Sequence, residues 1–252
     1  MKCVRLKQLV LGEGMPKICA PLVGTGRDAL LAEAEGFLQL PIDVAEWRAD
    51  WYEGILETGI LGGILPLLRA KLPDLPLLFT FRTHTEGGHL PADLPAYETL
   101  LSEAICSGMI DLVDAELFAG DAAVKRLIKL AHSHGVKVIL SNHDFDATPA
   151  EDELSDRLHK MAALGADIAK LAVMPNSPLD VLTLLSATAK ASQSLSCPII
   201  SMSMKGAGLI SRIGGEVFGS CLTFGSAGNV SAPGQIDVRV LREMLQAIHG
   251  SL

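Results

Sequence analysis

The chain has 252 residues, of which 49% are hydrophobic, and a formal net charge of −8 at pH 7. This length and apolar content are enough to bury one large core, and the negative charge argues against a nucleic-acid partner. No stretch has the roughly 18 uninterrupted apolar residues of a membrane helix, and the N-terminus lacks the long apolar centre of a signal peptide. The five cysteines are scattered, without a C-x-x-C pair, which predicts free thiols and no metal site. We therefore expect a cytoplasmic protein.

Eight short apolar segments recur along the chain at intervals of about 30 residues, the length of one strand-and-helix unit. Several are apolar at consecutive positions, as parallel strands buried on both faces are. The predicted strands cover residues 17–22, 43–50, 77–82, 110–116, 137–143, 167–174, 198–204 and 221–225.

Helix signals lie between these strands. Thr148, Pro149 and Glu151 read as an N-cap, a proline at the first helical position and a capping-box glutamate, and Gly165 reads as the end of that helix. Ser177, followed by a proline, reads as the start of another helix. Strands and helices therefore alternate along the chain.

Eight such units in about 250 residues predict a closed (β/α)₈ barrel of the α/β class, since an open doubly wound sheet more often has five or six strands. We expect one domain over residues 1–252. Residues of about 1–16 would form a β-hairpin, with a Gly-x-Gly turn, that covers one mouth of the barrel, and residues of about 17–252 would form the barrel itself.

The most informative polar residues are Lys170 and His143, because catalytic groups of such barrels lie at the carboxyl ends of the strands. Lys170 sits inside an apolar strand. A buried lysine is costly unless it faces a polar cavity or loses its proton, and a neutral amine is a nucleophile toward ketones. The alternative is a lysine that reaches the surface or pairs with a carboxylate. His143, at a strand end, suits proton transfer, with a structural loop histidine as the alternative.

Three arginines, Arg48, Arg82 and Arg212, lie at or after three different strand ends. If they converge, they form a cationic pocket for a carboxylate or phosphate; taken singly, each is more often a surface residue or half of an ion pair. Glu46 and Glu86 would balance these charges or orient a base.

Together these segments resemble the type I 3-dehydroquinate dehydratase family along nearly the whole chain. The segments that carry the resemblance are Glu46-Trp47-Arg48, Phe79-Thr80-Phe81-Arg82 with Glu86-Gly87-Gly88, Ser141-Asn142-His143-Asp144-Phe145, Lys170 with Met174-Pro175, Ser201-Met202-Ser203-Met204, Ser211-Arg212, Gly215-Glu216-Val217-Phe218-Gly219-Ser220 and Ser231-Ala232-Pro233-Gly234-Gln235. Their shared order and spacing make the resemblance specific.

The resemblance implies dehydration of 3-dehydroquinate to 3-dehydroshikimate in the shikimate pathway, without a metal or other cofactor, by a cytoplasmic homodimer. It also implies the roles of the matching residues. Lys170 matches the Schiff-base lysine, His143 the proton-transfer histidine, and Glu86 the carboxylate that orients it. The substrate-binding positions would be Glu46, Arg48, Arg82, Arg212, Ser231, Gln235, Met202, Met204 and Phe224.

Pro21 departs from relatives that carry a small hydroxyl residue at the end of the first strand, which bears on affinity more than on the type of reaction. Two alternatives stay open. A class I aldolase of the same architecture would also use a lysine on the sixth strand, and a phosphorylated substrate would favour it. A non-catalytic barrel that binds a small acidic metabolite would have no need of a buried amine.

Overall fold

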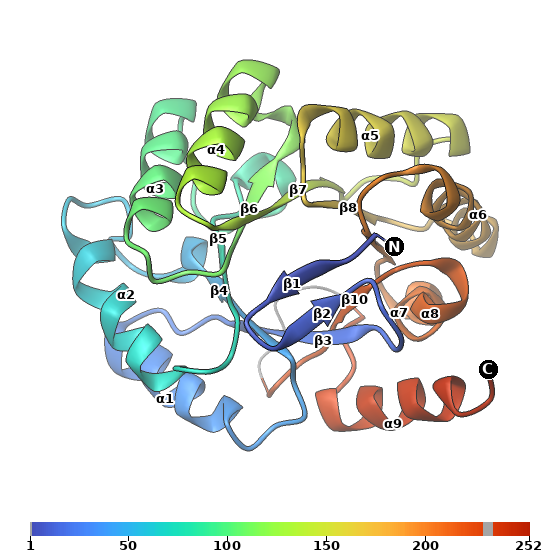
Figure 1. Cartoon of the computed structure of the whole chain (residues 1–252), viewed down its shortest axis with the longest axis horizontal. Coiled ribbons are helices and arrows are strands. Elements are labelled where there is room, and N and C mark those ends of the chain that lie inside the picture. The colour runs from blue at the N-terminus through green and yellow to red at the C-terminus, as the bar shows by residue number, and fades with distance from the viewer. Residues whose placement is uncertain (1, 229–233) are drawn as a thin grey trace.

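The computed structural model describes residues 2–228 and 234–252. Within these ranges, eight parallel strands form a ring surrounded by helices (Figure 1). The strands are β3 (Lys17–Leu22), β4 (Val44–Arg48), β5 (Leu77–Thr80), β6 (Leu112–Glu116), β7 (Lys137–Asp144), β8 (Ile168–Val173), β9 (Ile199–Ser203) and β10 (Leu222–Phe224). Their order is β10-β3-β4-β5-β6-β7-β8-β9, and a bridge from Ile199 to Ser220 links the two ends. The predicted barrel is confirmed.

The helices cover the outer face of the strands (Figure 1). They are α1 (Arg27–Phe37), α2 (Ile60–Lys71), α3 (Leu94–Cys106), α4 (Asp121–Ser133), α5 (Glu151–Leu164), α6 (Pro178–Ser194), α7 (Leu209–Ile213), α8 (Gly215–Phe218) and α9 (Val238–His249). Short 3₁₀ turns follow four of the strands: η1 (Ala49–Trp51), η2 (His84–Glu86), η3 (Leu117–Ala119) and η4 (Gly206–Gly208). In the described part of the chain, no helix is both long and apolar enough to cross a membrane.

One predicted helix start is confirmed and one is wrong. Ser177 caps α6 with a complete capping box. Helix α5 instead begins at Glu151, and its N-cap, Ala150, makes no side-chain cap hydrogen bond. The Thr148 hydroxyl donates to the Met174 carbonyl at 2.9 Å, so this side chain joins two loops rather than capping the helix. Acidic residues in the first turn of α5 favourably oppose the positive end of its dipole.

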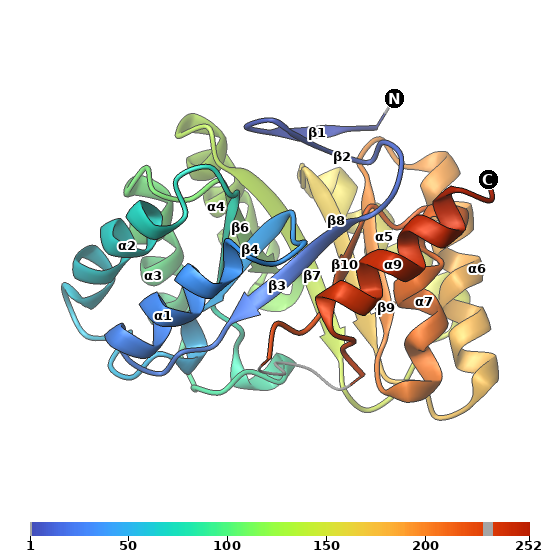
Figure 2. The same ribbon diagram turned by 90° about the horizontal axis from the view of Figure 1, so that it is seen from below.

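The predicted N-terminal hairpin is present as β1 (Val4–Leu6) and β2 (Leu9–Leu11), which pair antiparallel. It lies across the end of the barrel where the strands begin (Figure 2). Val4, Leu6 and Leu11 are buried in one cluster with the first inward-facing side chain of each barrel strand. Burying a side chain of this size contributes about 1.5–3 kcal/mol to the stability of the fold. The three side chains also close this mouth of the barrel with an apolar plug.

Along each strand, side chains point alternately into and out of the barrel. The innermost layer next to the hairpin is apolar: Cys19, Val44, Leu78, Leu112, Ile139, Ile168, Ile200 and Leu222. Two residues further along several strands, the inward positions become polar: Glu46, Thr80, Asp114, Ser141 and Lys170. The polar site therefore begins halfway up the barrel and opens at the carboxyl ends of the strands.

Candidate active site

A cavity occupies this polar half of the barrel. Its lining includes every sequence-predicted site residue that the structure describes: Glu46, Arg48, Arg82, Glu86, His143, Lys170, Met202, Met204, Arg212, Phe224 and Gln235. Ser231, the remaining one, lies outside the described residues. Gly87, Phe145 and Ala172 also line the cavity. The structure thus brings together residues from five strands, β4, β7, β8, β9 and β10, and from the segments that follow β5, β7, β9 and β10.

Lys170 rises from the middle of β8 and is only 3% exposed. Its Nζ donates to Asp114 Oδ2 at 2.8 Å and lies 4.7 Å from the centroid of the Phe224 ring. Both sequence-based readings of Lys170 therefore hold in part, because the amine faces a cavity and also pairs with a carboxylate.

His143 and Glu86 form a hydrogen-bonded pair. The imidazole Nδ1 lies 2.9 Å from Glu86 Oε2, and the backbone N–H of His143 donates to the same oxygen at 3.0 Å. The Asn142 amide donates to Glu86 Oε1 at 3.3 Å. A carboxylate at Nδ1 selects the tautomer with the proton on that nitrogen. Nε2 is then the basic nitrogen.

Burial sets the protonation of this pair. It raises the pKa of Glu86 to about 7, against the opposing charge of Arg82. Burial, together with the nearby Arg82 and Lys170 cations, also holds the pKa of His143 well below its ordinary value. The imidazole is therefore neutral near pH 7, the state in which it can accept a proton.

The loop after β5 is folded so that Glu86 points inward. It makes the short turn η2, which ends at Gly87 with a φ of +80°. Gly88 donates from its backbone to Thr83 at 2.8 Å, and a Cβ at Gly88 would lie 1.8 Å from the Arg82 carbonyl oxygen. Both glycines are therefore required by this turn, the first by its backbone angle and the second by close packing.

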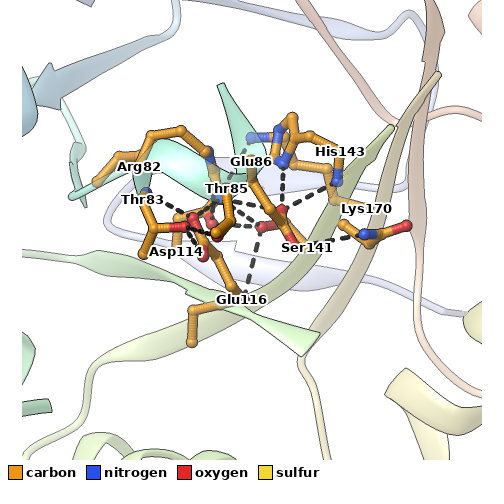
Figure 3. Close-up of polar contacts among 12 residues, drawn as sticks. Arg82, Thr83, Thr85, Glu86, Asp114, Glu116, Ser141, His143 and Lys170 are labelled. Carbon is orange, nitrogen blue, oxygen red and sulfur yellow. Dashed lines mark hydrogen bonds and ion pairs between the residues drawn. The ribbon is translucent and has the colours of Figure 1, made fainter. Parts of the chain in front are cut away.

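Arg82 is the centre of a buried charge network (Figure 3). Its guanidinium donates to Asp114 Oδ1 and Glu116 Oε1, each at 2.8 Å, and lies 3.6 Å from Glu86 Oε2. A further bond runs to the Ser141 hydroxyl at 3.1 Å. Although Arg82 lines the cavity, as a substrate-binding residue would, its strongest contacts are with the protein's own carboxylates.

The other charged residues of the site are held in different ways. Arg48 forms a two-pronged pair with Asp50, with both contacts at 2.8 Å. Glu46 accepts from the Thr80 hydroxyl at 2.9 Å. Arg212 is 1% exposed, and its Nη1 donates to the Phe224 carbonyl at 3.4 Å. Burial lowers the pKa of Arg212 to about 10, so its charge persists near neutral pH.

Asp114, Glu116 and Ser141 received no role from the sequence, although each has a hydrogen bond in this network. The sequence did contain a pattern that could have indicated them, because Asp114 and Glu116 alternate with apolar residues on one strand, β6. Asp114, like Lys170, is a charged residue inside a buried strand. The pairing of the two could not be read from the chain, since it depends on how three strands are aligned.

Fold and site together define a class of protein: a (β/α)₈ barrel with a lysine amine and a histidine–carboxylate pair facing one cavity at the carboxyl ends of its strands. This arrangement offers a nucleophile and a proton-transfer group to the same bound molecule.

Comparisons with known proteins give the family. A sequence model described as type I 3-dehydroquinase matches residues 18–251. The 3-dehydroquinate dehydratase of Listeria welshimeri is 51% identical over 249 residues, covering 99% of each chain, and that of Bacillus licheniformis is 47% identical, covering 100% of this chain and 99% of its own. The crystal structure of the Clostridium difficile type I enzyme with covalently modified comenic acid has a TM-score of 0.97, 44% identity and full coverage of both chains. The chain belongs to the type I 3-dehydroquinase family.

Proposed function

We propose that this protein dehydrates 3-dehydroquinate to 3-dehydroshikimate, a hydro-lyase step of the shikimate pathway, through a Schiff base on Lys170. The observation that carries this assignment is the meeting of Lys170 with the His143–Glu86 pair in one cavity. Membership of the family supplies the substrate. The Clostridium difficile relative with covalently modified comenic acid is consistent with a reactive group in that enzyme's site.

The reaction begins when the Lys170 amine, after giving up a proton, attacks the C3 ketone. Loss of water then gives a protonated imine, in which nitrogen carries the positive charge. This cation withdraws electrons from the neighbouring C2, whose proton becomes more acidic. His143, neutral because of its surroundings, takes that proton on Nε2 and leaves an enamine.

The enamine electrons then expel the hydroxyl at C1, and His143 returns its proton to the leaving oxygen, so that water departs. Water hydrolyses the remaining imine, which frees the enone product and restores the Lys170 amine. Glu86 holds the imidazole in position at both steps through its contact with Nδ1. General acid–base catalysis of this kind contributes about 10²–10⁴-fold.

The remaining cavity residues would hold the substrate. Arg212 is the cation for its carboxylate, and Glu46, Arg48 and Gln235 suit its hydroxyls, with Ser231 proposed from the family resemblance. Met202, Met204 and Phe224 form an apolar wall, and Arg82 would help to hold the hydroxyls and to shape the site. Fixing the carboxylate orients C1 and C2 toward His143.

We further propose that the protein works in the cytoplasm as a homodimer and without a cofactor. Two apolar side chains of α6, Leu179 and Leu182, are 70% and 60% exposed and would suit a contact with a second copy. The aldolase alternative receives less support, because a neighbour acting on a sugar phosphate, 3-hexulose-6-phosphate synthase, is only 17% identical and shares the fold alone.

The test is to incubate the purified protein with 3-dehydroquinate, with and without borohydride. We expect an enone absorbance without the reductant, and with it a stable mass increase on the peptide that contains Lys170. Lys170→Ala should abolish the mass increase. Absence of both the enone and the adduct from the unaltered protein would overturn the assignment and favour tests with phosphorylated sugars.

A further inference from the structure

Asp114 is a fully buried carboxylate held by three hydrogen-bond donors from three different residues. Its Oδ1 accepts from Arg82 Nη2 at 2.8 Å and from Ser141 Oγ at 2.5 Å, and its Oδ2 accepts from Lys170 Nζ at 2.8 Å. Because Arg82 also pairs with Glu116 and Glu86, the donors around Oδ1 are themselves fixed. One oxygen is therefore anchored and the other is turned toward the lysine.

Three neighbouring strands bring this carboxylate and the amine together. Asp114 lies on β6, Ser141 on β7 and Lys170 on β8, and the side chains of Ser141 and Lys170 both donate to Asp114. Ser141 is the direct neighbour of Lys170 across the β7–β8 pair. Of these two described residues, Lys170 lines the cavity and Asp114 does not. Asp114 can thus act on a bound molecule only through the cavity-lining residues that it contacts, Lys170 and Arg82.

We propose that Asp114 is a positioning residue that fixes the orientation of the imine formed on Lys170. This inference rests on the proposed function. A protonated imine is planar and its nitrogen carries one N–H, with the lysine carbon and the substrate carbon in the other two positions. If that N–H keeps the hydrogen bond to Asp114 Oδ2, the carboxylate decides in which plane the imine lies.

The plane of the imine matters because of the next step. Electrons from the C2–H bond can flow into the imine only when that bond stands roughly perpendicular to the imine plane. His143 is fixed by Glu86, so it can remove the C2 proton efficiently only from one orientation of the substrate. Asp114 would fix the orientation of the imine and Glu86 that of the His143 imidazole, so that the C2–H bond of the substrate faces the imidazole.

The charge on Asp114 suits this role. Burial opposes its ionisation, but Arg82 and Lys170 outweigh burial and lower its pKa to about 2. The carboxylate is therefore charged across the working range of pH. It stays beside a nitrogen that is positive both as ammonium and as protonated imine, so the same contact serves before and after the covalent bond forms.

The test uses Asp114→Asn, which keeps the size of the side chain but replaces one acceptor oxygen with a donor. We expect this variant to form the borohydride-trapped adduct on Lys170 with a KM within about threefold of the unaltered protein, while kcat per trappable site falls by about 10²–10³-fold, the usual effect of removing one preorganised group. With substrate deuterated at C2, the isotope effect on kcat should rise, since proton removal becomes the slow step.

A matched control is Asp111→Asn, which removes the negative charge from the 2.9 Å pair between Asp111 and Arg69, just before the start of β6. Its kcat per trappable site should stay within about twofold of the unaltered protein. A second variant, Ser141→Ala, loosens the anchored oxygen of Asp114 without removing the carboxylate. We expect it to lower kcat per trappable site about tenfold, with the same rise in isotope effect, and it keeps the test decisive if Asp114→Asn does not fold.

The proposal is overturned if folded Asp114→Asn loses less than tenfold in kcat per trappable site, if its isotope effect does not rise, or if it forms no adduct while still binding substrate. If Asp114→Asn only lowers the fraction of folded protein, its kcat per trappable site stays unchanged. Such a result would indicate a purely structural role for Asp114. If the unaltered protein gives neither enone nor adduct, the proposed function fails and the role of Asp114 falls with it. If the unaltered protein turns over and the variants do too, only the role of Asp114 fails.

Discussion

Replacing Arg82 with methionine tests whether the buried charge network is balanced by this one cation. Arg82 is 3% exposed and contacts Asp114 and Glu116 at 2.8 Å and Glu86 at 3.6 Å. Methionine has a similar length but no charge, so Arg82→Met leaves three carboxylates with one counter-cation fewer. Breaking a single buried pair costs about 3–5 kcal/mol, and with three carboxylates affected we expect about 5 kcal/mol. In a chain of this size each kcal/mol lowers Tm by about 2–4 °C, which predicts a fall of about 10–20 °C.

The loss from Arg82→Met should also depend on pH. Glu86 in the folded protein has a pKa of about 7, above the ordinary 4.5, so the folded state becomes less stable as pH rises from 4.5 through 7. Arg82 opposes this rise in pKa, so its removal strengthens the effect. Arg82→Met should therefore cost more stability at pH 8, where Glu86 is charged, than at pH 5, where Glu86 is protonated.

The assay is thermal and urea unfolding, followed by circular dichroism at pH 5 and pH 8. The control is Arg126→Met, which removes an equally well-formed pair with Glu98 from a side chain that is 61% exposed. Exposed pairs contribute little, so this variant should unfold close to the unaltered protein. A fall of less than about 4 °C for Arg82→Met, or an equal loss at both pH values, would refute the reasoning.

Three further predictions concern the histidine and its surroundings. Glu86→Gln removes the group whose pKa burial raises to about 7, so stability measured by urea unfolding should fall less between pH 4.5 and 7 than in the unaltered protein; an unchanged slope would count against it. His143→Ala should still give the trapped adduct on Lys170 but turn over about 10²–10⁴-fold more slowly, and normal turnover would exclude His143 as the proton carrier. Gly87→Ala places a Cβ 2.3 Å from the Phe145 ring, which lines the cavity, so the KM for the substrate should rise. The control is Gly14→Ala, at a glycine that also has a positive φ but has no atom within 4 Å of the added Cβ. This control should lower stability and leave KM unchanged.

The barrel could be predicted because two simple patterns are independent of tertiary detail. Apolar runs spaced by about 30 residues define the strands, and the carboxyl-end rule then selects the polar residues that share a mouth. Lys170, His143 and the three arginines Arg48, Arg82 and Arg212, all selected in this way, line the cavity. The family resemblance supplied the roles, which the residues alone left open between catalysis and structure.

What the sequence could not supply depends on alignment between distant segments. Asp114 and Lys170 are 56 positions apart, and their contact follows from the way β6, β7 and β8 are paired. Thr148 was misread as a cap because Thr-Pro-x-Glu fits a helix start locally, whereas its hydroxyl is bonded to Met174 on another loop. In both cases the contact joins residues far apart in the sequence, which a local sequence pattern does not reveal.

The hairpin at the base of the barrel also limits how molecules move through the site. With Leu6 and Leu11 packed against the first layer of the interior, the barrel is a cup with a single opening rather than a tube. Whatever enters the cavity must leave by the way it came, and two molecules cannot follow one another through it. In a cavity of this shape, each product molecule has to leave through the open end before the next substrate molecule can enter.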